Sequence, residues 1–446
     1  MAGGVNVASQ FSGDYVSYLD KKILPIALRE LVVYQFAEKK NLPKGYGNTW
    51  LATRYQRVPL PQAPLSEAVP PVGETLTIQQ VTCVAQQWGD TVTVSDVAQL
   101  TIMHDPFQQA IRLMGIQQAE TYERTQFNAF NGIAQVNYVN SRGSRAALVA
   151  GDVLDPTTML RTYGALATLG ALKYGGPSEP NPQKSARGNA GGTTSPHFCA
   201  VCHTLIVADW SQNSTVVLAR SYSEVMRLYN YEIGSWAGVR VVESNMVPFW
   251  TGYAAVAGTG SGTGGTLPTA TDYYIIVTGS DIQNQYESYV AQVSTGITGV
   301  TTGGSVTLTT PSTSGYTYNV YIGTSTSPGN LGLSASGPTV GPLAGQAVQL
   351  PPGTSITITG IGIAQTPPPA PATGITVYRT YVFGRESFAV VTLQNVEHLM
   401  VTKADKSDPL NQRAVVGWKG YYGCLILNQT FLAAIESTSA FSTTFG

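Results

Sequence analysis

The middle of the chain carries no basic residue. Residues 251–376 contain neither Lys nor Arg, and their acidic residues are Asp272, Asp281 and Glu287. Gly, Ser, Thr, Val and Tyr dominate this stretch. Val, Thr and Tyr favour strands, whereas Gly and Ser favour turns. The composition therefore predicts an all-β segment that differs in kind from the sequence on either side of it.

Alternation of apolar and polar residues between turn signals supports that prediction. Strands are expected at residues 272–279, 286–294, 305–310, 316–323, 347–350 and 355–360. About seven short strands at such spacing indicate a β-sandwich. The stretches YYIIVTGSDIQNQYESYVAQVS and YTYNVYIGTS resemble immunoglobulin-like or fibronectin type III modules.

Both edges of the segment are predicted to be linkers. Residues 258–266 read GTGSGTGGT, a flexible tract, and residues 367–374 read PPPAPATG, which favours extended polyproline. Residues 258–374 are thus a predicted insertion in a loop of a host domain. Gly260, Gly262 and Gly265 also match the G-x-G-x-x-G spacing of dinucleotide sites. Because no helix is expected to follow them, a flexible linker is the favoured interpretation.

The flanking sequence mixes helices and strands without βαβ regularity, which predicts an α+β host. The strongest helical pattern covers residues 105–131, which Asp105-Pro106 begins and Asn131-Gly132 ends. Other helices are expected at residues 20–40, 155–173 and 215–229. Strands are expected at residues 49–60, 75–97, 198–207, 380–393 and 420–432, of which the first two form a long hairpin.

Bulk composition argues against several classes of protein. Charged residues make up 11% of the chain and the net charge is −1, so no strong field attracts nucleic acid or an anionic membrane. The four cysteines are too few to indicate a disulfide scaffold. We recognise neither a secretory signal in MAGGVNVASQFSGDY nor an apolar run of membrane-spanning length, and therefore expect a cytoplasmic protein with reduced thiols.

Several flanking segments resemble one protein family. In chain order they read KGYGNTWLATRYQRVPLP, PLSEAVPPVGE, QQWGDTVTVSD, ERTQFNAF, VFGRESFAVVTL and SDPLNQRAVVGWKGYYGCLILNQTFLAAIE. These segments are similar to the major capsid proteins of N-four-like podoviruses, tailed phages whose coat proteins have the Hong Kong 97-type fold. The likeness covers residues 15–250 and 376–437. Ala68 stands where the family usually has Gly.

The resemblance implies the domain organisation of that fold. It gives an N-terminal arm (1–55), an extended loop (56–97), a peripheral domain (98–150 and 376–420) with a spine helix (105–131), and an axial domain (151–250 and 421–446). It also implies a non-enzymatic subunit without cofactor or metal. Such subunits self-assemble in the bacterial cytoplasm into pentamers and hexamers, which form the icosahedral head of the virion around double-stranded DNA.

The resemblance further implies portal and scaffolding proteins as partners. Packaged DNA would meet the inner face only weakly, and no membrane is involved. The predicted insertion would face outward, because a segment without Lys or Arg is repelled by DNA. A secreted adhesin or carbohydrate-binding protein remains the alternative, suggested by the sandwich alone.

Charged residues are the candidates for contacts between subunits. A basic cluster with interleaved aromatic residues precedes two acidic loop positions, and a second group lies near the C-terminus. The candidates are Lys39, Lys40, Lys44, Arg54, Arg57, Glu67, Glu74, Asp408, Arg413 and Lys419. The basic cluster could instead face packaged DNA. We favour pairing between subunits, because the net charge is near zero.

Two further patterns suggest chemistry. Cys199, Cys202 and His203 formally match a haem attachment motif or part of a zinc site. Residues three apart on a strand face opposite sides, so a pair of buried thiols is the favoured interpretation. The long helix carries the carboxylates of Asp105, Glu120 and Glu123 together with Arg124. Paired carboxylates can serve acid–base chemistry, but we expect these residues on a solvated or intersubunit face. His104 and His398 have no evident nucleophile partner. We therefore predict no catalytic residue.

Overall fold

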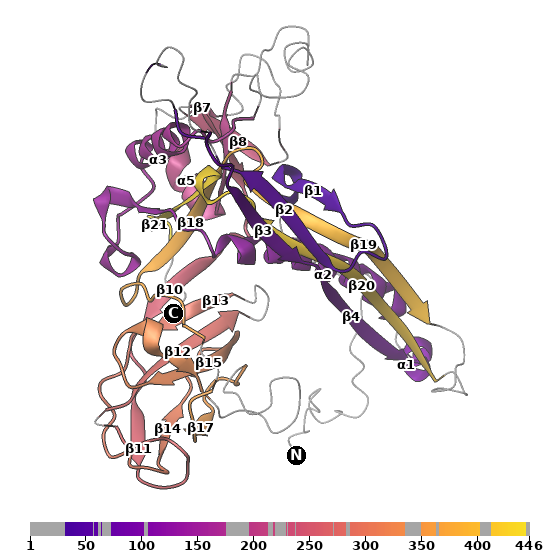
Figure 1. Cartoon of the computed structure of the whole chain (residues 1–446). Coiled ribbons are helices and arrows are strands. Elements are labelled where there is room, and N and C mark those ends of the chain that lie inside the picture. Colours follow the sequence, from indigo (N-terminus) through magenta and orange to yellow (C-terminus); the bar gives the residue numbers. More distant parts are fainter. Residues whose placement is uncertain are drawn as a thin grey trace, which may run out of the picture. The chain divides into compact units, whose positions relative to one another are not determined.

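A computed structural model of the chain describes residues 32–56, 58–60, 64, 73–101, 106–174, 196–212, 217–218, 229, 231–236, 238–270, 272–281, 286–334, 349–362, 365–401 and 412–442. The described residues form two compact units (Figure 1). The smaller unit lies in Gln87–Ala119 and Asn395–Tyr421, and the larger in Arg29–Gln86, Glu120–Gln394 and Tyr422–Gly446. Among the described residues no helix is long and apolar enough to cross a bilayer.

A four-stranded sheet of order β1-β19-β20-β4 contributes strands to the smaller unit. Its strands are β1 (Glu38–Asn41), β4 (Gln86–Ser95), β19 (Phe388–Val401) and β20 (Arg413–Ile426), and the short helix α1 (Asp96–Thr101) follows β4. Within the unit, the Trp418 indole N–H donates to Gln117 at 3.2 Å, and Gln117 donates to Asp90 at 2.7 Å. These two bonds join β20, β4 and the long helix that follows α1.

The strongest helical pattern of the sequence forms the longest helix, α2 (Pro106–Phe130). Its bounds differ by one residue at each end from the prediction, while the expected cap Asp105 lies outside the described residues. The helix ends at Asn131-Gly132 as predicted, where the backbone N–H of Gly132 donates to Ala129 in a tight turn. Phe127 and Phe130 are fully buried and fix the last turns of α2 in the core of the larger unit.

The larger unit is organised around a 12-stranded sheet. Its main path runs β16-β15-β12-β13-β10-β18-β6-β9-β8-β7, β21 pairs with β18, and β5 pairs with β21. The strands are β5 (Val136–Tyr138), β6 (Phe198–Cys202), β7 (Val217–Leu218), β8 (Glu232–Trp236), β9 (Val239–Glu243), β10 (Phe249–Tyr253), β12 (Tyr274–Asp281), β13 (Glu287–Ala291), β15 (Tyr316–Gly323), β16 (Gly332–Leu333), β18 (Thr376–Phe383) and β21 (Leu432–Ser437). Every residue of β18 and β21 is buried, which places these two strands in the middle of the core.

Helices cover both faces of the central strands. The helices α3 (Pro156–Thr168) and α5 (Thr204–Ser211) pack on one face, and α2 packs on the other together with the 3-10 turn η2 (Val33–Phe36). The Asp155 carboxylate caps α3 by accepting the backbone N–H of Thr158 at 3.3 Å, in agreement with the predicted start. Further 3-10 turns are η3 (Val139–Ser141), η4 (Arg145–Ala147), η6 (Pro328–Asn330) and η7 (Gln429–Phe431).

The segment without basic residues forms two facing sheets, as its alternation predicts. The strands β16, β15, β12 and β13 make one layer, and a three-stranded sheet of order β11-β14-β17 makes the other. The bounds of the second layer are β11 (Gly258–Ser261), β14 (Ser305–Thr309) and β17 (Ser355–Ile358). Side chains of both layers share one buried cluster, which includes Ile275, Val306, Tyr318 and Ile358. Of the expected strand at residues 347–350, only Gln349 and Leu350 are described, and Leu350 bridges to Tyr318.

The predicted linkers are not free tethers. Residues 258–261, expected to be flexible, are strand β11 and pair with β14. A Cβ on Gly260 would lie 2.2 Å from the carbonyl oxygen of Thr298, so Gly is needed there for close packing. Host strand β10 also pairs in parallel with β13, for example Thr251 with Tyr289. Main-chain hydrogen bonds therefore join the segment to the host sheet.

Three other expectations are wrong. Residues 38–40, predicted to be helical, lie in strand β1, because pairing with β19 outweighs the local pattern. The strand expected at residues 198–207 ends at Cys202, where the His203 imidazole accepts the backbone N–H of Leu205 and begins α5. Val217 and Leu218, predicted to be helical, pair with β8 as β7. The remainder of that predicted helix lies almost wholly outside the described residues.

Candidate functional site

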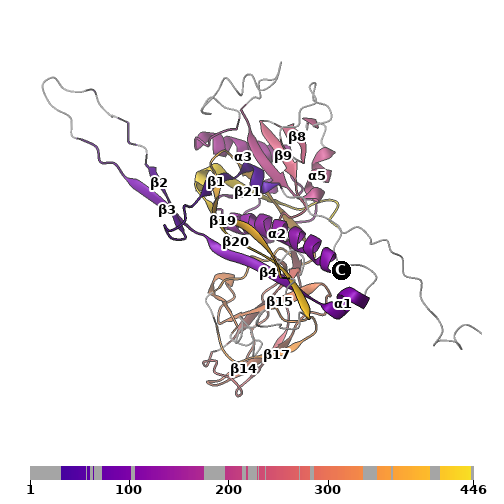
Figure 2. The ribbon, with the colours of Figure 1, turned by 90° about the vertical axis from the view of Figure 1, so that its right-hand side faces the viewer.

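An antiparallel pair of strands, β2 (Thr49–Tyr55) and β3 (Ile78–Val84), forms the predicted hairpin (Figure 2). Trp50, Val81 and Cys83 pack with Leu425 of β20 on one side. The alternate positions point away from this cluster. Large apolar side chains that remain exposed on the hairpin and beside it are Leu51, Tyr55, Val58, Leu60, Leu76, Ile78 and Val84.

This apolar surface is unusual for a chain that functions alone. A two-stranded sheet is at best marginally stable in water, and contiguous exposed apolar patches mark binding surfaces. Tyr55 lies opposite Ile78 in the register, and their side chains are 63% and 51% exposed. The hairpin therefore presents a surface suited to burial against another molecule.

The charged candidates divide into described and undescribed positions. Arg57, Glu67 and Asp408 lie outside the described residues. Seven are described: Lys39, Lys40, Lys44, Arg54, Glu74, Arg413 and Lys419. Six of them are exposed, and Lys419 is half-buried. Their assignment to contacts between subunits remains a prediction.

Local partners are known for some of these side chains. Lys39 lies 4.3 Å from the centroid of the Tyr34 ring, and Lys40 pairs with Glu38 at 2.8 Å. Arg54 donates to Gln79 across the hairpin. Lys419 pairs with Glu397 at 3.3 Å on neighbouring strands. Such exposed pairs contribute only ~0–1 kcal/mol, so these cations can exchange partners at little cost.

A buried ionic cluster lies at the centre of the larger unit. The Glu436 carboxylate, 1% exposed, accepts hydrogen bonds from Arg145 Nη2 at 2.6 Å and from Arg379 Nε at 2.9 Å. The Arg145 guanidinium stacks 3.9 Å from the Trp250 ring. Burial by itself would raise the pKa of Glu436, but the hydrogen bonds and charges of the two arginines outweigh it and lower that pKa. Glu436 is therefore held as a carboxylate.

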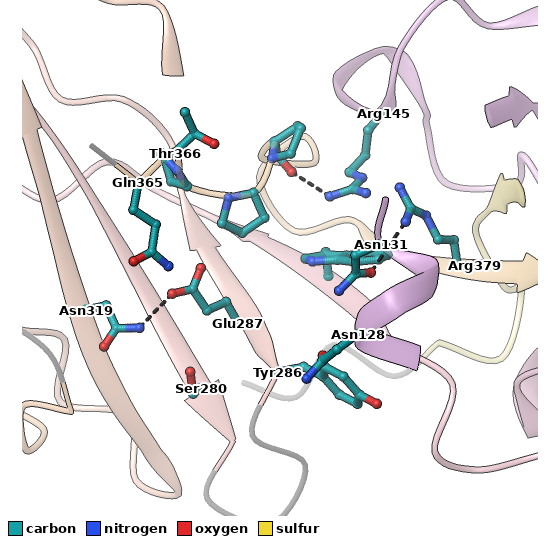
Figure 3. Close-up of a pocket in the computed structure, with 14 residues that line it drawn as sticks. Asn128, Asn131, Arg145, Ser280, Tyr286, Glu287, Asn319, Gln365, Thr366 and Arg379 are labelled. Atoms are coloured by element: carbon teal, nitrogen blue, oxygen red, sulfur yellow. Dashed lines mark hydrogen bonds between the residues drawn. The ribbon is translucent and has the colours of Figure 1, made fainter. Parts of the chain in front are cut away.

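A cavity of about 580 Å³ opens beside this cluster (Figure 3). Host residues, including Asn128, Asn131, Arg145 and Arg379, line one side, and Ser280, Glu287, Asn319 and Gln365 line the other. Arg145 also donates through Nη1 to the carbonyl oxygen of Pro369 at 2.9 Å. The predicted second linker is thus tied to the buried cluster and forms a wall of the cavity.

The two thiols of the cysteine motif lie on opposite sides of strand β6. Cys202 packs among the side chains of one core cluster and Cys199 among those of the other, on opposite faces of β6 as predicted. Burial raises the pKa of Cys202 to about 12 and lowers that of His203 to about 4. The two thiols therefore cannot bind one group. Across the part of the chain that the structure describes, no cluster of His, Cys, Asp or Glu could hold a metal ion.

Glu123 departs from the expectation of a solvated helix face. It is 2% exposed, and its Oε1 accepts the backbone N–H groups of Val32 and Val33 at 2.8 and 2.7 Å. Burial raises the pKa of Glu123 to about 7, although these bonds act to lower it. The long helix thus uses Glu123 to hold the turn η2.

Comparison with solved structures identifies the fold. The capsid of Ralstonia phage GP4 matches over 98% of both chains with a TM-score of 0.50 and 8% sequence identity. The chain has the fold of a phage capsid protein. This capsid fold is of the Hong Kong 97 type, as the sequence resemblance implied.

Other capsids are similar at lower scores. The capsid of cyanophage P-SCSP1u matches with a TM-score of 0.47 and 10% identity over 95% of this chain and 93% of that one. The acid-stable capsid of Helicobacter pylori bacteriophage KHP30 matches with a TM-score of 0.47 and 7% identity over 98% of both chains. No family model matches the sequence, and neither does any curated protein.

The buried ionic cluster of Arg145, Arg379 and Glu436 was not predicted from the sequence. A signal existed, because Arg379 interrupts the apolar strand TVYRTYVF and Glu436 follows the apolar run LAAI. A charge inside a buried strand requires a buried partner. The identity of that partner was not predictable, since Arg145 lies 291 residues before Glu436.

Proposed function

We propose that the chain is the major capsid protein of a tailed double-stranded DNA phage, related to those of N-four-like podoviruses. The near full-length match to a phage capsid carries this proposal. Copies of the chain assemble into hexamers and pentamers that form the icosahedral shell of the virion. The function is association without catalysis.

The hairpin of β2 and β3 supplies the main adhesive surface in this proposal. Its exposed apolar side chains, such as Leu51, Tyr55 and Ile78, become buried on a neighbouring subunit. Burial releases about 25 cal/mol for each Å² of apolar surface removed from water. Exposed cations such as Arg54 and Lys44 then pair with acidic residues of the neighbour and fix the register.

The proposed domains are those of the capsid fold: arm, extended loop, peripheral domain and axial domain, with residues 258–374 as an immunoglobulin-like insertion. The two facing sheets with a shared core support the insertion. It faces outward, because it lacks basic residues that DNA would attract. Portal and scaffolding proteins complete the shell, and packaged DNA meets the inner face weakly.

Electron microscopy of the purified chain tests the proposal. Expression with and without a candidate scaffolding protein should yield closed icosahedral shells or free capsomers. Purified chain that stays monomeric under every condition, including high concentration and added scaffold, would contradict the capsid function.

A further inference from the structure

The cavity beside the buried ionic cluster has walls of opposite charge. On the wall formed by residues outside 258–374, the guanidinium groups of Arg145 and Arg379 surround the carboxylate of Glu436. This side therefore carries one positive charge in excess. Arg145 and Arg379 are themselves 4% and 8% exposed, so the excess charge is largely shielded from bulk water. Buried charges are costly unless they are paired.

The opposite wall carries one negative charge. Oε1 of Glu287 accepts hydrogen bonds from Asn319 Nδ2 at 2.6 Å and from the Tyr321 hydroxyl at 2.8 Å. Both donors are neutral, and no cation pairs with Glu287 among the described residues. Figure 3 shows the Glu287 carboxylate and the Arg145 guanidinium extending from opposite sides of the cavity.

These two walls make the cavity neutral in sum but dipolar across its width. A lone anion is attracted by the arginines and repelled by Glu287, and a lone cation meets the reverse. A molecule with both charges gains from both walls. The lining amides of Asn128, Asn131 and Gln365 add groups that can either donate or accept hydrogen bonds. The volume of about 580 Å³ lies in the range of small-molecule sites.

We propose that this cavity binds a small zwitterion, with its carboxylate toward Arg145 and Arg379 and its ammonium group toward Glu287. Amino acids are ligands of this class. The site lies where residues 258–374 join the host sheet, so a bound ligand bridges the two parts of the larger unit. The inference is independent of the capsid function, because it depends only on the walls of the cavity.

Isothermal titration calorimetry of the full chain with a series of ω-amino acids tests the proposal. The probes are glycine, β-alanine, 4-aminobutyrate and 6-aminohexanoate, which separate the same two charges by increasing distances. Butyrate and butylammonium at matched ionic strength carry one charge each. We expect one ω-amino acid to bind at least tenfold more tightly than either single-charge probe. Equal affinities, or no saturable binding by any ω-amino acid, would overturn the proposal.

Substitution of Glu287 separates the two ends of the site. In Glu287→Gln the amide oxygen still accepts from Asn319 and Tyr321, but the charge is gone. The preferred ω-amino acid should then bind no more tightly than butyrate, whose own affinity is unchanged or increased. Glu386→Gln, which removes an exposed carboxylate of the larger unit away from the cavity lining, should leave all affinities as they were. A tenfold preference that persists in Glu287→Gln contradicts the assigned orientation.

Discussion

Oε1 of Glu123 accepts the backbone N–H of Val33 at 2.7 Å, which joins two residues 90 positions apart in the sequence. The same oxygen accepts the N–H of Val32. A 3-10 or α-helical turn leaves its first N–H groups without partners, and here a side chain from the middle of α2 supplies the acceptor. The first described residues of the chain are therefore held by one buried carboxylate.

Stability should depend on pH through Glu123. Its pKa is raised from 4.5 to about 7, so the folded chain binds this proton more tightly than the unfolded chain does. The resulting stabilisation is complete below about pH 4.5 and is lost as the pH rises through about 7. A shift of this size corresponds to about 3.4 kcal/mol in all, of which about 2.5 kcal/mol falls between pH 5 and pH 8. Urea unfolding from pH 5 to pH 8 measures it.

Glu123→Gln should remove most of that pH dependence, because an amide does not titrate in this range. The matched control is Glu74→Gln, since Glu74 is exposed. If the free energy of unfolding of both variants depends on pH as it does in the unsubstituted chain, Glu123 is not the source of that dependence.

Loss of Glu436 should strongly destabilise the larger unit. Glu436→Gln leaves Arg145 and Arg379 buried without a counter-charge, and breaking such a cluster costs about 3–5 kcal/mol. Because the pKa of Glu436 is lowered, its contribution is present above the unfolded value of 4.5 and is lost as the pH falls below it. Denaturant titration measures the free energy of unfolding of the variant and of the unsubstituted chain. The difference between the two free energies should be smaller at pH 4 than at pH 7. An unchanged unfolding midpoint at pH 7 would contradict the role of the cluster.

The hairpin should be required for assembly but not for folding. Ile78→Asp places a charge on the exposed apolar surface and should reduce the yield of shells at least tenfold, because the charge would have to be buried on the neighbouring subunit. The melting temperature of the unassembled chain should stay the same, because Ile78 is 51% exposed in the single chain. Thr357→Asp, at an exposed position on β17, is the control. Sedimentation and electron microscopy measure shell formation by the two variants. Normal shells from Ile78→Asp would contradict the proposal that this surface of the hairpin binds a neighbouring subunit.

Gly260 distinguishes a packed strand from a flexible linker. Gly260→Ala forces a Cβ against the Thr298 carbonyl and should cost about 1–3 kcal/mol. Gly329→Ala has open space around its Cβ and should be nearly neutral. Thermal unfolding compares the two variants. A neutral Gly260→Ala would restore the linker interpretation.

Patterns within a single element were predictable from the sequence. The bounds of α2 and the strands β12, β14, β15 and β17 follow from periodicity, because their neighbours in space do not oppose the local preference. The glycine tract was predicted wrongly as a flexible linker. Glycine makes a linker flexible, but it also lets two backbones approach closely, as it does at Gly260. Residues 38–41 became a strand through pairing with β19, which local sequence does not encode.

For contacts between distant segments, the sequence indicates that a charge is buried but not which residue is its partner. The strand sequences around Arg379 and Glu436 indicate buried charges, but the partner and the cavity beside them depend on how distant segments fold together. The opposite faces of Cys199 and Cys202 were predictable, because strand geometry alone determines them.

The parallel pairing of β10 with β13 has a mechanical consequence. A force applied to residues 258–374 along the strand direction acts in shear on the hydrogen bonds between β10 and β13. A flexible linker would instead extend under the same force. The ladder continues from β10 into β18 and β6 at the centre of the core. A peptide grafted at the turn η6 would accordingly keep a fixed orientation to the sheet that contains β10 and β18.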